Sequence, residues 1–574
     1  MSNNKTASDN SDSEQVLNED FISDSEQILR KDFISGSSTS LLNIQENFVP
    51  DSPLINPQYN NVSSKKSNSF IKKSFFFALG STFVLSIFLI SNFLTEKKAQ
   101  VKSDGPINVI LMISDGFGPA SETMARQFYQ STNRLPASWK SPLDDILVGS
   151  SRTQSSDSLI TDSAAGATAF SCAMKSYNGA IAVDPSKKAC GTILEAAKLK
   201  GMLTGLVATS RITHATPGSF SAHVINRDME DLIAQYQIGN FSLGPVVDLM
   251  FGGGRCFFLP NSDINSCRKD NRDLISEAQN KGFTAISSIE QLNSLNSNQK
   301  LPLMGLFSGS HMDYEIDRDP LKQPSLSSMA DKAIKILSES SSKTSTGFFL
   351  MIEGSRIDMA AHSNDPATHI REIISYWDTV KLVRNFVDKN PNTVVVSVSD
   401  HETGGLSVAR QLGPEYPDYL WNPKALINVK MSIENISKKL LYFFNDNQNS
   451  NLDAKREFVK NVVFTKWLQV HEFEKEEVEA LTTAEKSTIL RQHLSDIISK
   501  RALLGWATHG HSAVDVNLYA YGYQSSQLRG NNENSDIGSF IKNILNLDLE
   551  SVTKLISNDP TVQKTPFSSS EWLG

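Results

Sequence analysis

Ile107-Asn108-Val109-Ile110-Leu111-Met112-Ile113 is an apolar run that leads directly into Ser114-Asp115-Gly116. Such a run predicts a β-strand that is buried on both faces, as strands are in parallel sheets. Residues 348–352 and residues 394–398 repeat the pattern, and they end in Glu353 and in Asp400-His401. Because ligands of open α/β sheets bind outside the carboxyl ends of the strands, the three acidic ends predict a shared site that binds metal.

Helical patterns alternate with these apolar runs. Residues 190–200 predict a helix, and residues 202–208 predict the strand that follows it. This alternation predicts an α/β fold around a large, mostly parallel sheet. The main domain is expected over residues 106–574. It contains an insertion at about residues 410–500, with helical patterns near residues 431–444 and 471–493.

The overall charge of the chain narrows the range of partners. Its 574 residues carry a formal net charge of −8, which gives no electrostatic reason to expect nucleic-acid binding. The four cysteines include no Cys-x-x-Cys pair, so a structural zinc cluster is not expected.

Residues 1–70 have the composition of a disordered cytosolic tail, rich in Ser, Asn, Asp and Glu. The tail contains a short repeat in which an aspartate precedes an aliphatic pair by four residues. The two copies place Asp12 before Val16-Leu17 and Asp24 before Ile28-Leu29. This spacing resembles the acidic dileucine signals that sorting adaptors bind. A plain solvated tail is the alternative.

Residues 75–94 are almost entirely apolar. About 20 such residues at ~1.5 Å each match the ~30 Å hydrocarbon core of a bilayer. A secretory signal peptide would have a shorter apolar region close to the N-terminus. We therefore expect a transmembrane signal anchor over residues 71–95, a short stem over residues 96–105, and every later residue on one side of the membrane.

All four cysteines follow the expected membrane span, and an even number suits an oxidising lumen. Cys256 and Cys267 bracket a short loop and could pair, which would leave Cys172 to pair with Cys190. Four buried free thiols are the alternative. Two N-glycosylation patterns lie on the same side, at Asn240-Phe241-Ser242 and Asn435-Ile436-Ser437. Together these features predict a single-pass type II protein with a cytosolic N-terminus.

Ser163 is the candidate nucleophile. It lies in Thr161-Asp162-Ser163-Ala164-Ala165-Gly166, where small residues would let a helix begin close to whatever the serine faces. A helix N-terminus offers unpaired N–H groups and the positive end of the helix dipole, which suit an anionic substrate. The alternative is that Ser163 only caps the helix, because serine is a preferred capping residue.

Histidines join the acidic residues in spacings that suit a metal ion. Asp358 and His362 are four residues apart and would share one face of a helix. The pair Asp400-His401 offers a second carboxylate and imidazole, and zinc accepts this mixture of ligands. Far along the chain, His509 and His511 would point to the same side of an extended segment, so either could be a ligand.

Together these motifs resemble the metal-dependent alkaline phosphatases, especially their membrane-anchored vacuolar members in fungi. The resemblance begins near Gly105 and implies a three-layer α/β sandwich that hydrolyses phosphate monoesters with two zinc ions and one magnesium ion per subunit. It assigns Asp358, His362 and His511 to one zinc site, and Asp115, Asp400 and His401 to the other. It assigns magnesium to Asp115, Thr216 and Glu353. His511 is chosen over His509 because the motif His511-Ser-Ala-Val-Asp515-Val matches the family spacing.

The resemblance also assigns roles in catalysis. Ser163 would attack phosphorus to give a phosphoserine, and Arg227 would hold the phosphate through its planar fork. Asp162 would position Arg227, and His214 would lie beside the magnesium ligands rather than among them. Met359 departs from the family, where lysine or histidine follows the aspartate. Because methionine cannot donate a hydrogen bond to phosphate, we expect weaker product inhibition than a Met359→Lys or Met359→His variant would show.

Further expectations follow from the resemblance alone. They are a vacuolar or lysosome-like membrane, a homodimer, a crown-like insertion, and small phosphomonoesters or phosphoproteins as substrates. Sulfatases share the fold but need an x-Pro-x-Arg sequence after the nucleophile, which Ser163-Ala-Ala-Gly-Ala lacks. A related phosphodiesterase and a non-catalytic luminal binding protein of the same fold are the alternatives.

Overall fold

The structure is a computed structural model and describes residues 105–446 and 451–559. The expected cytosolic tail, the membrane anchor at residues 71–95 and nearly all of the stem lie outside the described residues. Within the described ranges, no helix is both long and apolar enough to cross a membrane.

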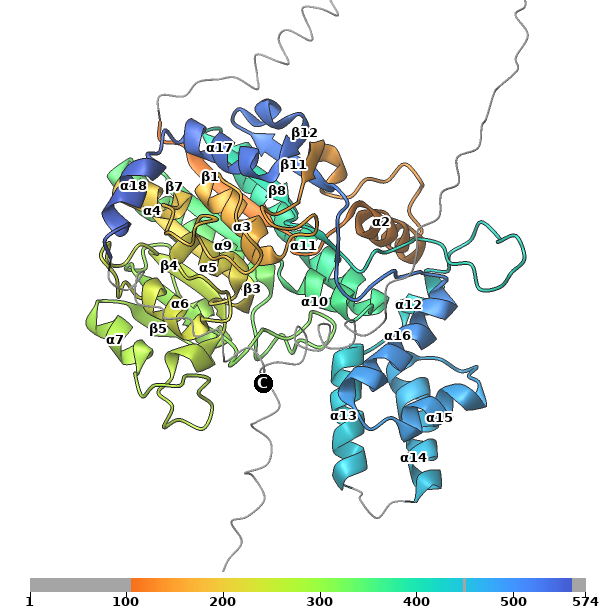
Figure 1. Ribbon diagram of the computed structural model, residues 1–574. Coiled ribbons are helices and arrows are strands. Elements are labelled where there is room, and N and C mark those ends of the chain that lie inside the picture. Colours follow the sequence, from red (N-terminus) through yellow and green to blue (C-terminus); the bar gives the residue numbers. More distant parts are fainter. Residues whose placement is uncertain (1–104, 447–450, 560–574) are drawn as a thin grey trace, which may run out of the picture. The chain divides into compact units, whose positions relative to one another are not determined.

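A ten-stranded sheet forms the centre of the described part of the chain (Figure 1). In their spatial order, its strands are β12 (Gly530–Glu533), β2 (Leu147–Arg152), β11 (Val516–Gly522), β8 (Thr393–Val398), β1 (Asn108–Ile113), β7 (Phe348–Glu353), β3 (Leu203–Arg211), β4 (Leu249–Gly253), β6 (Leu303–Leu306) and β5 (Thr284–Ile286). Neighbouring strands are parallel except at β11, which runs antiparallel to β2 and β8. The expected α/β fold with a large, mostly parallel sheet is confirmed.

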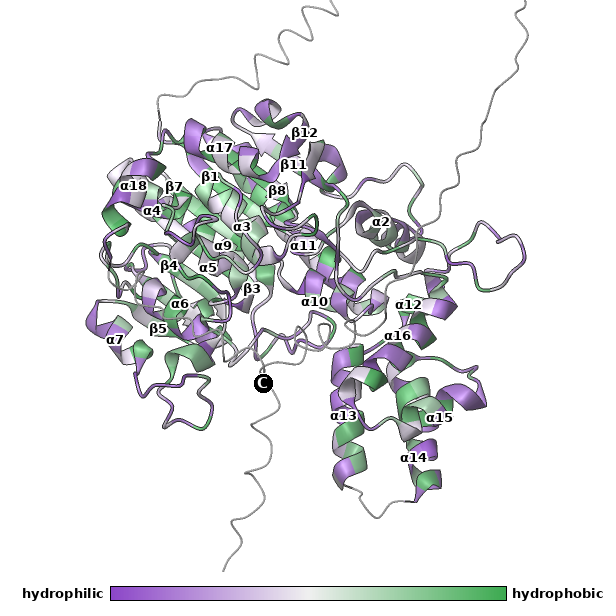
Figure 2. Cartoon of the chain, in the orientation of Figure 1, coloured by the Kyte–Doolittle hydropathy of each residue, from purple (hydrophilic) through white to green (hydrophobic). Residues whose placement is uncertain are grey.

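Successive side chains of β1 enter two different hydrophobic cores, because side chains of a strand alternate between its faces. Val109, Leu111 and Ile113 belong to one core, and Ile110 and Met112 belong to the other. All five are fully buried, and Figure 2 shows the central strands as hydrophobic. The sheet therefore lies between two layers of helices.

The first core is completed mainly by α3 (Ser163–Cys172), α4 (Ile193–Leu199), α6 (Glu230–Gln237), α7 (Leu274–Asn280), α17 (Asn534–Ile544) and α18 (Leu549–Ile556), with Phe220 from α5 (Ala215–Ser221). The second core is completed by α2 (Pro119–Asn133), α8 (Ile289–Ser294), α9 (Leu326–Thr344), α10 (Arg356–His362) and α11 (Pro366–Lys389). Both layers are built from helices that follow strands in the chain, as α/β connections require.

The expected insertion is helical and lies between the two short strands β9 (Glu402–Thr403) and β10 (His511–Ser512). Its elements are α12 (Lys424–Ile427), α13 (Ile433–Asp446), α14 (Leu452–Phe458), the π-helical stretch η4 (Val459–Leu468), α15 (Lys475–Thr483) and α16 (Ser487–Ala502). They enclose a third hydrophobic core, to which α2 and α11 also contribute.

Some expected boundaries differ from the structure. The single helix expected near residues 471–493 is two helices, because the backbone is extended at Ala484, just after α15, and at Lys486, just before α16. The helix expected from residue 190 begins at Ile193, because Thr192 caps it in a capping box with Glu195.

Candidate active site

The candidate site lies at the carboxyl ends of three adjacent strands. β1 pairs with β7 and β8 in parallel, and Ile113 lies opposite both Glu353 and Val398. The residues that follow therefore meet at one edge of the sheet, which brings Asp115, Glu353 and Asp400 together. This arrangement was expected from the three acidic strand ends.

Ser163 is the first residue of α3, and it is not the cap. Asp162 caps the helix, since its Oδ1 accepts a hydrogen bond from the Ala165 N–H at 2.9 Å. The capping role considered for Ser163 is thus taken by its neighbour, and the buried Ser163 hydroxyl faces the candidate site. The helix can lie close to the segment that follows β8 because Gly166 has no side chain: a Cβ there would lie only 2.9 Å from the Asp400 Cβ.

The Ser163 hydroxyl lies 3.1 Å from His401 Nε2 and 3.5 Å from Asp115 Oδ1. The tautomer of His401 follows from Thr403, whose hydroxyl donates to Asp358 at 2.5 Å. The same hydroxyl, 3.2 Å from His401 Nδ1, must therefore accept from that nitrogen. His401 Nε2 is left with a lone pair directed at Ser163.

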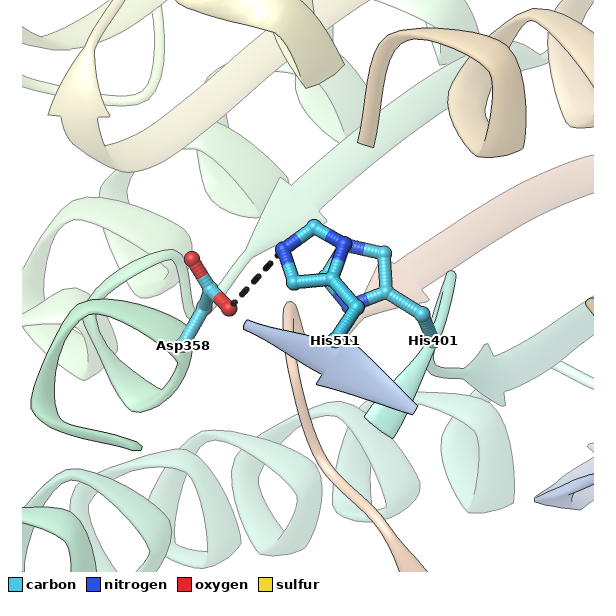
Figure 3. Close-up of side chains that lie close together, drawn as sticks. All are labelled: Asp358, His401 and His511. Carbon is cyan, nitrogen blue, oxygen red and sulfur yellow. Dashed lines mark ion pairs between the residues drawn. The ribbon is translucent and has the colours of Figure 1, made fainter. Parts of the chain in front are cut away.

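Asp358, His362 and His511 form the first group of candidate metal ligands. The Nε2 atoms of the two histidines are 3.1 Å apart, and His362 Nε2 lies 3.3 Å from Asp358 Oδ2. Figure 3 shows Asp358 beside His511, with His511 Nε2 3.8 Å from Asp358 Oδ1, and the rings of His511 and His401 stacked at 3.5 Å.

Both histidines of this group are oriented by backbone carbonyls. His511 Nδ1 donates to the Thr161 carbonyl at 2.8 Å, and His362 Nδ1 donates to the His509 carbonyl. In the neutral rings, each Nε2 then carries a lone pair, and the two lone pairs face each other. A cation between them would relieve this repulsion, and backbone carbonyls commonly orient metal-binding histidines in this way.

Asp358 lies beside three imidazoles that affect the pKa of its carboxyl. Burial acts to raise the pKa of this carboxyl, but His362, His511 and His401 outweigh burial and hold the pKa well below its usual range. The carboxylate is therefore ionised and available as a ligand.

Asp115, Asp400 and His401 form the second group, whose ligand atoms lie within 4.8 Å of one another. Asp115 Oδ2 and Asp400 Oδ2 are buried and lack a hydrogen-bond partner among the described residues. Burial, followed by repulsion from Asp358, raises the pKa of Asp400 to about 8, and burial with repulsion from Asp400 raises that of Asp115 well above its usual range. Buried carboxylates this close need a cation if they are to ionise together.

A third group surrounds Glu353, whose pKa burial raises to about 7. The Thr216 hydroxyl is close enough to lower that pKa, yet within the described ranges it has no partner in hydrogen-bond geometry. Glu353 Oε1 is buried and also has no partner there. With Asp115, these oxygen atoms offer the hard ligands that magnesium prefers.

His214 has a ring nitrogen within 4.8 Å of the Asp115 and Glu353 carboxylates. Its Nε2 lies 3.1 Å from Arg227 Nη2 and must accept from it, because a guanidinium only donates. The neutral ring then carries its proton on Nδ1 and offers no second lone pair. Distances alone would admit His214 to the third group with Asp115 and Glu353. Its place beside the magnesium ligands rather than among them stays a prediction.

Arg227 reaches the site from the segment between α5 and α6. Its Nη1 donates to Asp162 Oδ2 at 3.2 Å, so the residue that caps α3 also orients the guanidinium. His223, which precedes it by four residues, is fully buried in an ion pair with Glu195 at 2.8 Å. It is a core histidine, as expected.

Sequence reasoning missed several residues that support the site. Thr403 joins Asp358 to His401, and Ser210 donates to Glu353 at 3.3 Å. Arg211 binds Glu230 through two nitrogens and contacts His311, whose ring meets His214 edge-on. Thr403 could have been found, since it lies in the same strand-end motif as Asp400 and His401.

Among the described residues, the groups whose ligand atoms all lie within 4.8 Å of one another include His511 but neither His509 nor His362. His362 is linked to the site by its distances to His511 and Asp358 instead. The four cysteines form the disulfides Cys172–Cys190 and Cys256–Cys267, so the alternative of four free thiols is wrong. Asn240 is half-buried and donates to Glu277 at 3.1 Å, and Asn435 is half-buried in α13.

Residues 107–547 match the alkaline phosphatase family model. The chain belongs to the alkaline phosphatase family. The repressible alkaline phosphatase of Saccharomyces cerevisiae is 46% identical over 485 residues, which cover 81% of this chain and 85% of that protein. The alkaline phosphatase of Schizosaccharomyces pombe is 47% identical over 480 residues, which cover 83% and 88%.

Solved structures agree with this assignment. A cold-active alkaline phosphatase from Shewanella is 30% identical with a TM-score of 0.65, covering 76% of this phosphatase and all of that chain. The alkaline phosphatase of the Antarctic bacterium TAB5 is 28% identical with a TM-score of 0.56, and one variant of it is described with Mg bound in its M3 site. The chain is therefore a phosphatase enzyme, and the alternative of a non-catalytic binding protein is set aside.

Proposed function

We propose that this phosphatase hydrolyses phosphate monoesters of broad specificity through a phosphoserine at Ser163. The observation that carries the proposal is the position of the Ser163 hydroxyl, at the N-terminus of α3 and 3.1 Å from His401 Nε2. The α3 N–H groups and the helix dipole favour a bound phosphate at this point.

The chain's residues fit two zinc ions and one magnesium ion, because each group contains buried oxygen atoms without partners in the described ranges or histidine lone pairs that converge. Zinc would be held by Asp358, His362 and His511, and by Asp115, Asp400 and His401; magnesium would be held by Asp115, Thr216 and Glu353. When bound, such cations supply the positive charge that lowers the pKa of a hydroxyl or a water and stabilises a leaving alkoxide.

The reaction proceeds in two displacements at phosphorus. The Ser163 oxygen forms a bond to phosphorus while the ester P–O bond on the opposite side breaks, and the alcohol leaves. Water then cleaves the phosphoserine and restores Ser163. Arg227 holds two phosphate oxygens through its fork, a geometry that lysine cannot supply.

Asp162 contributes by orienting the guanidinium of Arg227. Its Oδ2 holds Arg227 Nη1 at 3.2 Å, and its Oδ1 keeps the first turn of α3 in place. The nucleophile and the phosphate-binding guanidinium are thereby fixed to the same residue, which reduces the reorganisation needed when phosphate binds.

The test uses the purified full chain in detergent with zinc and magnesium. We expect turnover of p-nitrophenyl phosphate, none by Ser163→Ala, and a phosphoryl group on the Ser163 peptide after acid quenching. Bis-p-nitrophenyl phosphate should react far more slowly. If the diester reacts faster, the protein is instead a phosphodiesterase of the same superfamily.

We further propose a type II protein of a vacuolar or lysosome-like membrane, whose cytosolic tail binds a sorting adaptor and whose luminal part is a homodimer. The two disulfides and the apolar residues 75–94 support a luminal catalytic part. Protease protection of intact vacuoles tests the topology: the tail should be digested and the phosphatase should remain whole. Removal of Ile28-Leu29 together with Val16-Leu17 should redirect the protein.

A further inference from the structure

The helix α10 carries two ligands of the first metal group, Asp358 and His362, although it is only seven residues long. A helix of this length is not stable by itself, because helices shorter than about 12 residues are marginal in water even with favourable sequences. Contacts with neighbouring segments must therefore set the position of α10. Several of these contacts come from the helical insertion, which begins only after β9 in the chain.

The insertion binds the first residue of α10 through a buried ion pair. The side chain of Arg356 is 8% exposed, and its Nη2 donates to Glu434 Oε2, in the first turn of α13, at 3.1 Å. Arg356 Nη1 donates to the Met312 carbonyl at 2.7 Å, and Arg356 Cζ lies 3.5 Å from the centre of the Tyr314 ring. With contacts on all these sides, the guanidinium fixes the point at which α10 begins.

Glu434 is ionised in this pair. Burial acts to raise its pKa, but Arg356, followed by Lys438, outweighs burial and lowers the pKa of Glu434 to about 2. Removal of one member of a buried ion pair leaves the other charge without compensation, which is costlier than the loss of an exposed pair. A neutral side chain at position 434 would therefore leave Arg356 to seek other partners.

The insertion also binds the residues that immediately follow α10. The Ile433 N–H of α13 donates to Asp365 Oδ2 at 2.9 Å. The Ser495 hydroxyl of α16 donates to the Asn364 carbonyl at 2.7 Å. The two helices of the insertion thus bind the chain on both sides of the metal-ligand pair, at residue 356 and at residues 364 and 365.

The main domain holds α10 at other points. The Ser355 hydroxyl accepts a hydrogen bond from the Ser210 N–H at 3.0 Å, and His369 Nδ1 donates to the Ile357 carbonyl at 2.9 Å. Because these contacts do not involve the insertion, loss of one insertion contact should shift α10 without unfolding it. The position of the metal ligands can then change while the fold persists.

We propose that the insertion positions α10 for metal binding, and that Glu434 is a positioning residue that acts through Arg356 on the zinc ligands Asp358 and His362. The inference rests on the proposed zinc sites. Substitution of residues that orient metal ligands changes metal affinity by about 10-fold to 100-fold. Because Glu434 acts through one further residue, we expect an effect at the lower end of this range.

The test measures zinc binding to the metal-free full chain in detergent, with magnesium present and a chromophoric chelator as competitor. Glu434→Gln keeps the shape of the side chain but removes its charge, and it should weaken one of two zinc-binding steps about tenfold. His362→Ala identifies the step, because His362 is a ligand of the first group alone. Glu479→Gln is the matched control, because Glu479 pairs with Arg456 at 2.6 Å inside the insertion.

Ser495→Ala tests the other end of α10. It removes a single hydrogen bond to the Asn364 carbonyl, so it should weaken the same zinc-binding step about threefold. Hydrogen exchange of the metal-free protein gives a readout without zinc. Exchange over residues 356–362 should be faster in Glu434→Gln and Ser495→Ala than in the wild type, and unchanged in Glu479→Gln.

A double-mutant cycle tests whether Glu434 acts through Arg356. Arg356→Met should weaken the zinc-binding step about as much as Glu434→Gln does. The two substitutions together should have little more effect than either one, because they remove the same pair. Additive effects would show that Glu434 acts by another route, and the inference would be wrong.

The outcomes separate this inference from the zinc sites on which it rests. If the wild type binds no zinc, or if His362→Ala retains both steps, the proposed zinc site is wrong. If zinc binds as proposed but equally tightly to Glu434→Gln, the site stands and the inference is overturned. Equal weakening by Glu479→Gln would also overturn it, because the general stability of the insertion would then explain the effect. Should Glu434→Gln not fold, unchanged zinc binding by Ser495→Ala overturns the inference.

Discussion

Asp162 Oδ2 accepts a hydrogen bond from Arg227 Nη1 at 3.2 Å, while Oδ1 of the same carboxylate caps α3. One side chain thus fixes both the helix that begins at Ser163 and the guanidinium proposed to bind phosphate. One oxygen atom of Asp162 caps the helix and the other orients Arg227. Substitutions of Asp162 and of Ser163 can separate these two roles from the proposed role of Ser163 as the nucleophile.

The capping assignment predicts unequal effects on stability. Asp162→Ala should lower the free energy of unfolding by about 1 kcal/mol, because the Ala165 N–H loses its acceptor. Ser163→Ala leaves this cap in place and should lower the free energy of unfolding by less than Asp162→Ala does. Urea unfolding of the metal-free protein measures both, and equal losses would show that Ser163 shares the capping role.

Arg227→Lys should weaken binding of substrate phosphate more than it slows the chemical step. Lysine keeps the positive charge but loses the planar fork, so we expect KM for p-nitrophenyl phosphate to rise roughly thirtyfold. Arg152→Lys is the control, because Arg152 is half exposed and pairs with Glu533. An unchanged KM would remove Arg227 from the phosphate site.

Removal of metal should destabilise the protein, because Asp115, Asp400 and Glu353 are buried close together. A ligand that binds only the folded state adds about 4 kcal/mol at a concentration 1,000 times its Kd. Calorimetry with and without a chelator should show a lower melting temperature after chelation. With metal bound, Asp400→Asn should be less stable than the wild type. Without metal at pH 9, the same variant should be more stable than the wild type. The same rank in both conditions would argue against a cation at Asp400.

Glu122 predicts a pH dependence of stability that is independent of the metal site. Burial raises its pKa from 4.5 to about 7, while Trp377 and Ser141 donate hydrogen bonds to it. Above pH 4.5 the unfolded chain releases this proton and the folded chain keeps it, so stability falls as the pH rises to about 7. Between pH 4.5 and about 7, the free energy of unfolding of Glu122→Gln should therefore rise relative to that of the wild type, by up to about 3 kcal/mol. A difference that stays constant from pH 5 to pH 8 would contradict the raised pKa.

Met359 follows Asp358 in α10, where we expect no hydrogen bond to phosphate. Met359→Lys should lower the inhibition constant of inorganic phosphate, while the apolar control Met359→Leu should leave it near the wild-type value. Identical constants for all three proteins would show that this position does not meet phosphate.

The parallel centre of the sheet was predictable because strands buried on both faces leave uninterrupted apolar runs. β1, β7 and β8 lie within one residue of their expected limits. β11 was not expected, since Asn517 interrupts its apolar pattern. Its antiparallel place beside β8 depends on contacts far apart in the chain.

The candidate site was predictable as a set of residues but not as a set of contacts. Asp162 and Ser163 are both good capping residues, so sequence alone could not decide which one caps α3. The family resemblance placed His362 and His511 in one group. It could not show that the carbonyls of His509 and Thr161 set their tautomers, because those contacts depend on the folded backbone.

The disulfide Cys172–Cys190 closes the far end of the helix that begins at Ser163. With ten residues, α3 is a rod about 15 Å long, bonded covalently at one end and carrying the nucleophile at the other. A molecule that folds before its thiols oxidise would have the complete sheet but an untethered rod. The fraction of oxidised Cys172 is therefore a direct measure of how many molecules carry the nucleophile on a tethered helix.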